Sequence, residues 1–112
     1  MKLNNHCRIY TAENQGKGFI ISFNGMTLEA CIELASMDWS SVSGGFIGMG
    51  IDQYDIVMEI DQLCIDDGSS IVSDTAVYAC TKDTQFPLPL DKVVSACSKQ
   101  SDESRGLSFL FK

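Results

Sequence analysis

Apolar and polar positions alternate most clearly in residues 19–24, FIISFN, a pattern that predicts a half-buried strand. Asn24 and Gly25 then supply a turn in which φ can be positive. Thr27 is a predicted helix N-cap, and the apolar residues after it recur with the i, i+3, i+4, i+7 spacing of one helix face. That face consists of Leu28, Cys31, Ile32 and Ala35. The stretch therefore predicts a strand that runs into a short helix with a cysteine on its buried side.

Further strands are predicted along the rest of the chain. Residues 7–11, CRIYT, predict a short strand that forms a hairpin with residues 19–24. The segments 54–60, YDIVMEI, and 71–80, IVSDTAVYAC, predict two more strands. Residues 107–111 place three large apolar side chains on one face, which predicts a strand in the middle of the sheet.

Residues 44–51, GGFIGMGI, form a glycine-rich strand candidate. The segment lacks the Lys-Ser/Thr ending of a phosphate-binding loop and does not match the dinucleotide-binding pattern. We therefore interpret its glycines as marks of a bulged strand or of a close backbone contact.

A second short helix is predicted near the C-terminus, and it repeats the arrangement of the first. Its apolar face consists of Leu90, Val93, Val94 and Cys97. Two helices that each bury a cysteine favour a bridge between Cys31 and Cys97. In the chain-entropy model, closing a loop of roughly seventy residues stabilises the fold by about 4 kcal/mol.

Two further cysteines, Cys64 and Cys80, flank the turn sequence Asp66-Asp67-Gly68 on neighbouring strand candidates. A bridge across such a hairpin is one interpretation, although spacing alone does not determine disulfide connectivity.

The composition narrows the classes of function. A chain of 112 residues forms one domain, residues 1–112, in which residues 1–17 are a polar N-terminal segment. The net charge of −7 argues against nucleic acid and against an anionic membrane surface as partners, because both need clustered Lys and Arg. No apolar run reaches the length of a transmembrane span.

The five cysteines indicate an oxidising compartment with one or two disulfides. The odd count leaves one thiol free or paired between molecules. No CxxC motif or Cys/His cluster is present, and the single histidine, His6, stands beside Cys7, so no zinc site is expected. Residues 1–8 are polar and do not resemble a signal peptide, whereas the cysteine content indicates export. Because these two observations conflict, we expect the sequence to be a piece of a longer exported protein.

Acidic residues are concentrated in residues 52–67, within and around the strand candidate at residues 54–60. They are Asp52, Asp55, Glu59, Asp61, Asp66 and Asp67. The spacing of an EF-hand calcium loop is absent, so we favour a solvated acidic edge and expect neither metal nor cofactor. Trp39 is interpreted as a cap on the core, with an exposed binding residue as the alternative.

An enzyme is not predicted. A thiol nucleophile needs a positioned base, and His6 and Cys7 point to opposite faces if they are adjacent on a strand. No Ser/His/Asp set or metal cluster is visible in the sequence.

The order of these elements resembles the C-terminal part of type IV pilins. The matching pieces are residues 19–39, with ACIELA in the helix and then a tryptophan, the glycine-rich residues 44–51, and residues 89–112, with a helix ending in ACS and a terminal alternating strand. The similarity is greatest to the type IVb subclass, which includes the bundle-forming and toxin-coregulated pilins.

The resemblance implies an α+β fold, in which an antiparallel sheet is flanked by short helices. It also implies a disulfide between Cys31 and Cys97 that bounds a subunit-contacting region. The implied function is that of a structural subunit, major or minor, of a bacterial type IV pilus, with other pilin subunits as partners and adhesion to a host surface or protein ligand as a further role. The implied location is the cell surface, after export through the periplasm.

Weaker expectations for subunit contacts are Trp39, Asp52, Asp55, Asp66 and Asp67. The chain departs from the family pattern because a leader and a long apolar N-terminal helix are expected and neither is seen. Cys7, Cys64 and Cys80 also exceed the family's single bridge. Without that helix, the inner face that carries Phe19, Phe109 and Phe111 is expected to lie partly open, to be covered by dimerisation or by another chain. The alternative function is a secreted binding module, such as an adhesin tip or an inhibitor, that does not polymerise.

Overall fold

The computed structural model describes residues 3–11, 18–41, 45–53, 64–65, 68–74, 76–101 and 105–112, with only the backbone of residues 3–11, 52 and 53. The strands in this part of the chain are β1 Leu3–Thr11, β2 Phe19–Met26, β3 Phe46–Gln53, β4 Ile71–Val72, β5 Val77–Cys80 and β6 Arg105–Phe111. The helices are α1 Leu28–Ala35, the 3-10 turn η1 Trp39–Ser41, and α3 Leu90–Ser98.

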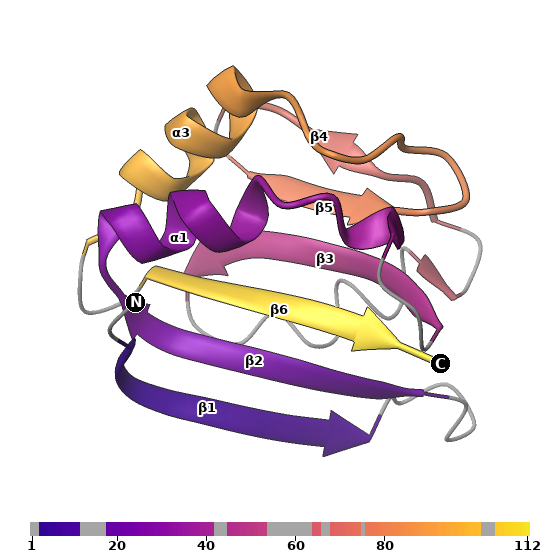
Figure 1. Ribbon diagram of the computed structural model, residues 1–112, viewed down its shortest axis with the longest axis horizontal. Coiled ribbons are helices and arrows are strands. Elements are labelled where there is room, and N and C mark those ends of the chain that lie inside the picture. The colour runs from indigo at the N-terminus through magenta and orange to yellow at the C-terminus, as the bar shows by residue number, and fades with distance from the viewer. Residues whose placement is uncertain are drawn as a thin grey trace.

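The six strands form one antiparallel sheet in the order β1-β2-β6-β3-β5-β4. Figure 1 shows α1 and α3 side by side, with the β1–β2 hairpin at the edge of the sheet away from α3. The predicted α+β class, an antiparallel sheet with short flanking helices, is confirmed. The predicted strand at residues 54–60 lies outside the described residues.

The predicted N-terminal hairpin is present, but both of its strands are longer than the pattern indicated. β1 begins at Leu3 rather than at residue 7, and β2 continues through Met26. Gly25 has the positive φ expected of a turn, 71°. The prediction that the strand ends at Asn24 is nevertheless wrong, because Met26 still pairs with Leu3 of β1. The irregularity is absorbed as a register shift in β1 between Leu3 and His6.

β6 is the central strand of the sheet, as its alternating apolar residues predicted. It pairs with β2 on one side and with β3 on the other, and all of its residues from Arg105 to Leu110 are buried. Both sets of side chains of β6 face a core, and Ser108 and Leu110 are therefore buried as well as Leu107 and Phe109. Leu107 and Phe109 accordingly face one core and Leu110 the other.

The glycine-rich segment forms β3 and contains the bulge that its glycines predicted. The register against β6 shifts between Phe46 and Gly48, so that two residues of β3 span one step of β6. Gly48 also makes a close contact, because a Cβ built on it would lie 2.5 Å from Sγ of Cys64 and 2.8 Å from the carbonyl oxygen of Ala79. Only glycine fits this position without a shift of its neighbours.

Residues 71–80 do not form the single strand that their apolar content predicted. The segment folds into two short strands, β4 and β5, which pair with each other. Ser73 is the reason for the reversal: its backbone N–H donates to the carbonyl of Ala76 and its Oγ accepts from the N–H of Ala76, at 3.0 and 3.2 Å. A serine hydroxyl that satisfies a nearby backbone group in this way stabilises a turn over an extended strand.

Both helices form where they were predicted, but each buries a slightly different face. Leu28 and Leu90, predicted to be buried, are 37 and 59 % exposed, and Val94 is exposed as well. Ala30 and Ala96 are buried in their place. Each alanine directly precedes a cysteine of the bridge between the helices, and the helices turn these small residues toward the core.

The sheet separates two hydrophobic cores, one on each of its faces. The larger one, between the sheet and the helices, contains Met49, Ile51, Val77, Ala79, Leu107 and Phe109 together with the buried helix residues. The smaller one lies on the opposite face and contains Ile20, Leu110, Cys64 and Cys80. On that face the buried hydroxyls of Ser22 and Ser108 bond to each other at 3.0 Å, so both are satisfied.

Candidate functional site

The most prominent chemical feature of the described residues is the disulfide between the two helices. Cys31 on α1 and Cys97 on α3 are bonded, with their Cα atoms 6.0 Å apart, inside the range of about 4.4–6.8 Å usual for disulfides. Both are fully buried in the larger core. Thr27 fixes the start of α1, because its Oγ1 accepts from the N–H of Ala30 at 3.1 Å. The bridge joins the two helices within the core that they share with the sheet.

Arg105, the first residue of β6, stabilises the ends of the elements that carry the bridge. Its side chain is buried and donates to three backbone carbonyls: Nε to Cys97 at 2.7 Å, one terminal nitrogen to Gln100 at 2.7 Å, and the other to Met26 at 3.0 Å. Two of these carbonyls lie at the C-terminal end of α3, where a positive charge also suits the helix dipole. The third carbonyl belongs to Met26, the last residue of β2, which lies just before α1.

A second disulfide joins Cys64 to Cys80 on β5, with a Cα separation of 5.2 Å. The expectation that both cysteines lie on adjacent strands of a hairpin is wrong for Cys64, whose own backbone is helical. Its Sγ instead reaches β3 across the space that Gly48 leaves free. The bridge lies on the face of the sheet opposite the helices, in the smaller core.

A cavity of about 260 Å³ lies beside this second bridge and is lined by Ile47, Cys64, Ile65 and Lys112. Three of these side chains are apolar, and Lys112 contributes the only charge among them. These described side chains suit an apolar group, and there is no nucleophile–base pair among them.

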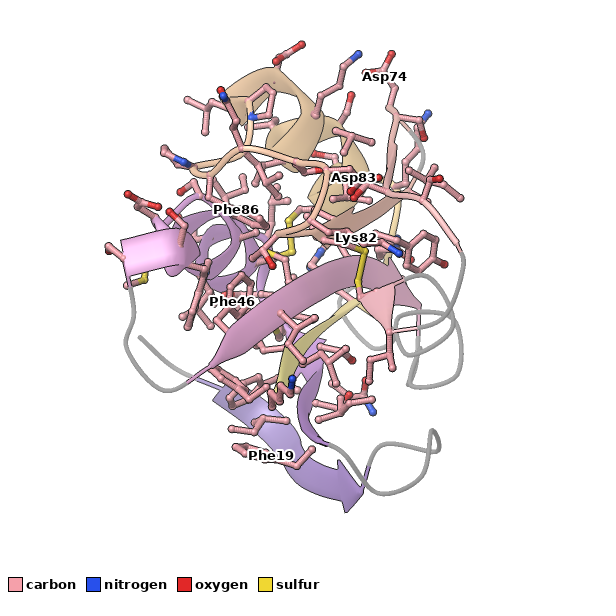
Figure 2. The ribbon with its side chains drawn as sticks, turned by 90° about the vertical axis from the view of Figure 1, so that its right-hand side faces the viewer. Phe19, Phe46, Asp74, Lys82, Asp83 and Phe86 are labelled. Atoms are coloured by element: carbon pink, nitrogen blue, oxygen red, sulfur yellow. A yellow bond between two sulfur atoms is a disulfide. The ribbon has the colours of Figure 1, made fainter. Side chains whose placement is uncertain are left out.

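Asp83 binds the segment that leads into β4. One carboxylate oxygen accepts from the N–H of Ser70 at 2.9 Å and the other accepts from the Ser70 hydroxyl, while that hydroxyl accepts from the N–H of Cys80 at 2.7 Å. The hydrogen bonds from the Ser70 side chain and backbone lower the pKa of Asp83 below its ordinary value of 3.8. Figure 2 shows Asp83 beside Lys82 on this end of the molecule. The contact between Ser70 and Asp83 orders a loop. The described side chains include no histidine that could complete a Ser/His/Asp set with this pair.

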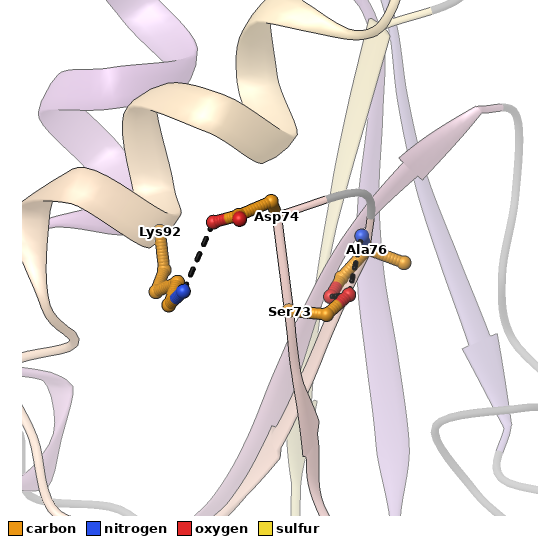
Figure 3. A network of polar contacts seen from close by, with 4 residues as sticks. All are labelled: Ser73, Asp74, Ala76 and Lys92. Carbon is orange, nitrogen blue, oxygen red and sulfur yellow. Dashed lines mark hydrogen bonds and ion pairs between the residues drawn. The ribbon is translucent and has the colours of Figure 1, made fainter.

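An ion pair connects the β4–β5 turn to α3. Nζ of Lys92 donates to Oδ1 of Asp74 at 3.0 Å, next to the Ser73–Ala76 hydrogen bonds of the turn (Figure 3). The hydrogen bond and the charge of Asp74 raise the pKa of Lys92. Both side chains are partly exposed, so water and salt weaken the attraction.

Trp39 packs as part of an aromatic cluster at one end of the larger core. Its ring lies 4.3 Å from Phe109 and 5.9 Å from Phe46, measured between centroids, and its Nε1 donates to the carbonyl of Leu34 at 2.7 Å. Phe46 also contacts Phe86, and both are labelled in Figure 2. These contacts match the interpretation of Trp39 as a cap on the core, with its polar atom bonded to the end of α1.

The aromatic row continues to the edge of the helix-side face, which is partly open as expected. Phe19 stacks on Phe111 with centroids 5.4 Å apart, yet it remains 40 % exposed. Phe109 is almost fully buried and Phe111 is half-buried. Of the three phenylalanines on this face, Phe109 is therefore covered and Phe19 is the most exposed.

The acidic residues predicted to form a contact surface lie largely outside the part of the chain that the structure describes. Asp55, Asp66 and Asp67 are not among the described residues, and only the backbone of Asp52, on β3, is described. The described residues contain no group of three His, Cys, Asp or Glu side chains that could hold a metal ion.

Sequence reasoning missed Arg105, whose side chain donates to three backbone carbonyls. Nothing in the local pattern marks it, because an arginine before an alternating segment is ordinary at a strand end. The Asp83–Ser70 pair was missed for a similar reason: its partners are 13 residues apart and meet only after β4 and β5 fold back on each other.

Within the described residues, no helix is long and apolar enough to cross a membrane. Comparisons with protein-family models, with curated proteins and with solved structures each found no match to this chain.

Proposed function

We propose that this chain is the globular part of a structural subunit of a bacterial type IV pilus, of the type IVb kind. The observation that carries the proposal is the Cys31–Cys97 bridge, which joins the helix after the N-terminal hairpin to the helix before the terminal strand. The resemblance implies a bridge between the same two cysteines, in an antiparallel sheet of the same class.

Two further properties support the proposal. Two disulfides in a chain of this size are typical of proteins in an oxidising compartment, which fits a subunit that is exported to the cell surface. The polar contacts of the described residues, including Arg105 and Asp83, are internal hydrogen bonds that stabilise the fold.

The test is to locate the chain on cells of the organism that encodes it. Immunogold labelling with an antibody against the chain is expected to follow surface filaments, and sheared surface material is expected to contain the chain. The double variant Cys31→Ala/Cys97→Ala is expected to reduce the assembled fraction, whereas Cys7→Ala, outside both described bridges, serves as the matched control.

Two outcomes would contradict the proposal. Recovery of the chain only as a non-polymerised protein in the medium would favour a secreted binding module instead. Recovery of the chain from the cytosol with reduced cysteines would contradict both the pilus subunit and the secreted binding module.

A further inference from the structure

We draw no further inference here: the strongest candidate, the partly open apolar strip that Phe19 and Phe111 form on the helix side of β2, carries nothing because nothing in the structure shows what covers it.

Discussion

Arg105 donates a hydrogen bond from Nε to the carbonyl oxygen of Cys97 at 2.7 Å, so the buried guanidinium contacts the residue that forms the disulfide to Cys31. The remaining nitrogens of the same group bond to Gln100 and Met26. One side chain thus connects the end of α3, the start of β6 and the end of β2. Its planar fork of donors suits three carbonyls at fixed positions, which an ammonium group cannot reach together.

Replacing Arg105 is therefore expected to destabilise the protein strongly. Arg105→Ala removes the donors of three buried carbonyls, at a cost of about 2–4 kcal/mol of unfolding free energy, and Arg105→Lys is expected to recover only part of it. Urea unfolding of the oxidised protein measures the change. Lys99→Ala, at an exposed position near the end of α3, is the control and should change stability by less than about 0.5 kcal/mol. An Arg105→Ala variant as stable as this control would refute the assigned role.

The two disulfides are expected to contribute unequally to stability. Their cysteines are 66 and 16 residues apart, and the chain-entropy model gives about 4 and about 3 kcal/mol for loops of these lengths. Cys31→Ala/Cys97→Ala should consequently lower the unfolding free energy more than Cys64→Ala/Cys80→Ala, as measured by urea unfolding. The reverse order would mean that local packing around Gly48 outweighs loop entropy.

Gly48 is expected to tolerate no side chain. Gly48→Ala forces a Cβ against Sγ of Cys64 and the carbonyl of Ala79, and overpacking of this kind costs about 1–3 kcal/mol. Unfolding measurements on Gly48→Ala, with and without Cys64→Ala/Cys80→Ala, separate the two clashes. Loss of the sulfur should relieve part of the penalty, while the clash with the backbone carbonyl remains. An additive result would show that the sulfur plays no part.

Asp83 is expected to make stability depend on pH in the acid range. Its pKa in the folded protein is lowered by the hydrogen bonds from Ser70, so protonation favours the unfolded chain. Its contribution is fully present above its ordinary value of 3.8, declines as the pH falls toward the lowered pKa, and is absent below it. The stability difference between the protein and Asp83→Asn should shrink over the same interval.

The cause of this pKa shift can be tested directly. Ser70→Ala is expected to move the NMR titration midpoint of the Asp83 carboxyl upward, toward its ordinary value. Ser69→Ala, an exposed neighbour in the same segment, should leave the midpoint in place. Equal midpoints in Ser70→Ala and Ser69→Ala would show that Ser70 is not the cause.

The Lys92–Asp74 pair is expected to contribute little. A double-mutant cycle with Lys92→Met and Asp74→Asn should give a small favourable coupling that about 1 M NaCl largely removes, because both groups are partly exposed. Since the pKa of Lys92 is raised, the coupling should persist below its ordinary value of 10.5 and disappear as the pH rises through the raised pKa. A coupling insensitive to salt would indicate that the pair is shielded from water.

Local pattern was sufficient to predict the type of several elements, although β2 and β3 each place side chains in both cores. The alternation in residues 19–24 and the cap at Thr27 predicted β2 and α1, and the glycines of residues 44–51 predicted the bulge and the close contact of β3. For β2 and α1 the physical cause lies within a few residues: a period of 2 or of about 3.6, and a hydroxyl that caps a helix. The glycines of β3 mark a close contact through the missing Cβ, but they do not identify its partners, Cys64 and Ala79.

Residues 71–80 show where local pattern was insufficient. Their apolar content is that of one long strand, and the decision to fold back depends on the Ser73–Ala76 hydrogen bonds and on the pairing of β4 with β5. The exposed Leu90 and the buried Ala96 of α3 are a second case in which local pattern was insufficient. Which face of α3 is buried depends on the position of Cys31, the disulfide partner of Cys97.

The element types and the two helices with a cysteine each follow from the order of residues along the chain, because periodicity and capping act over a single turn or strand. The position of Cys64 opposite Gly48, the contact of Arg105 with Met26 and the contact of Asp83 with Ser70 arise only when the chain folds and brings separate segments together. Each of them joins groups that have no sequence signature in common, and their energies depend on distances that the folded sheet alone sets.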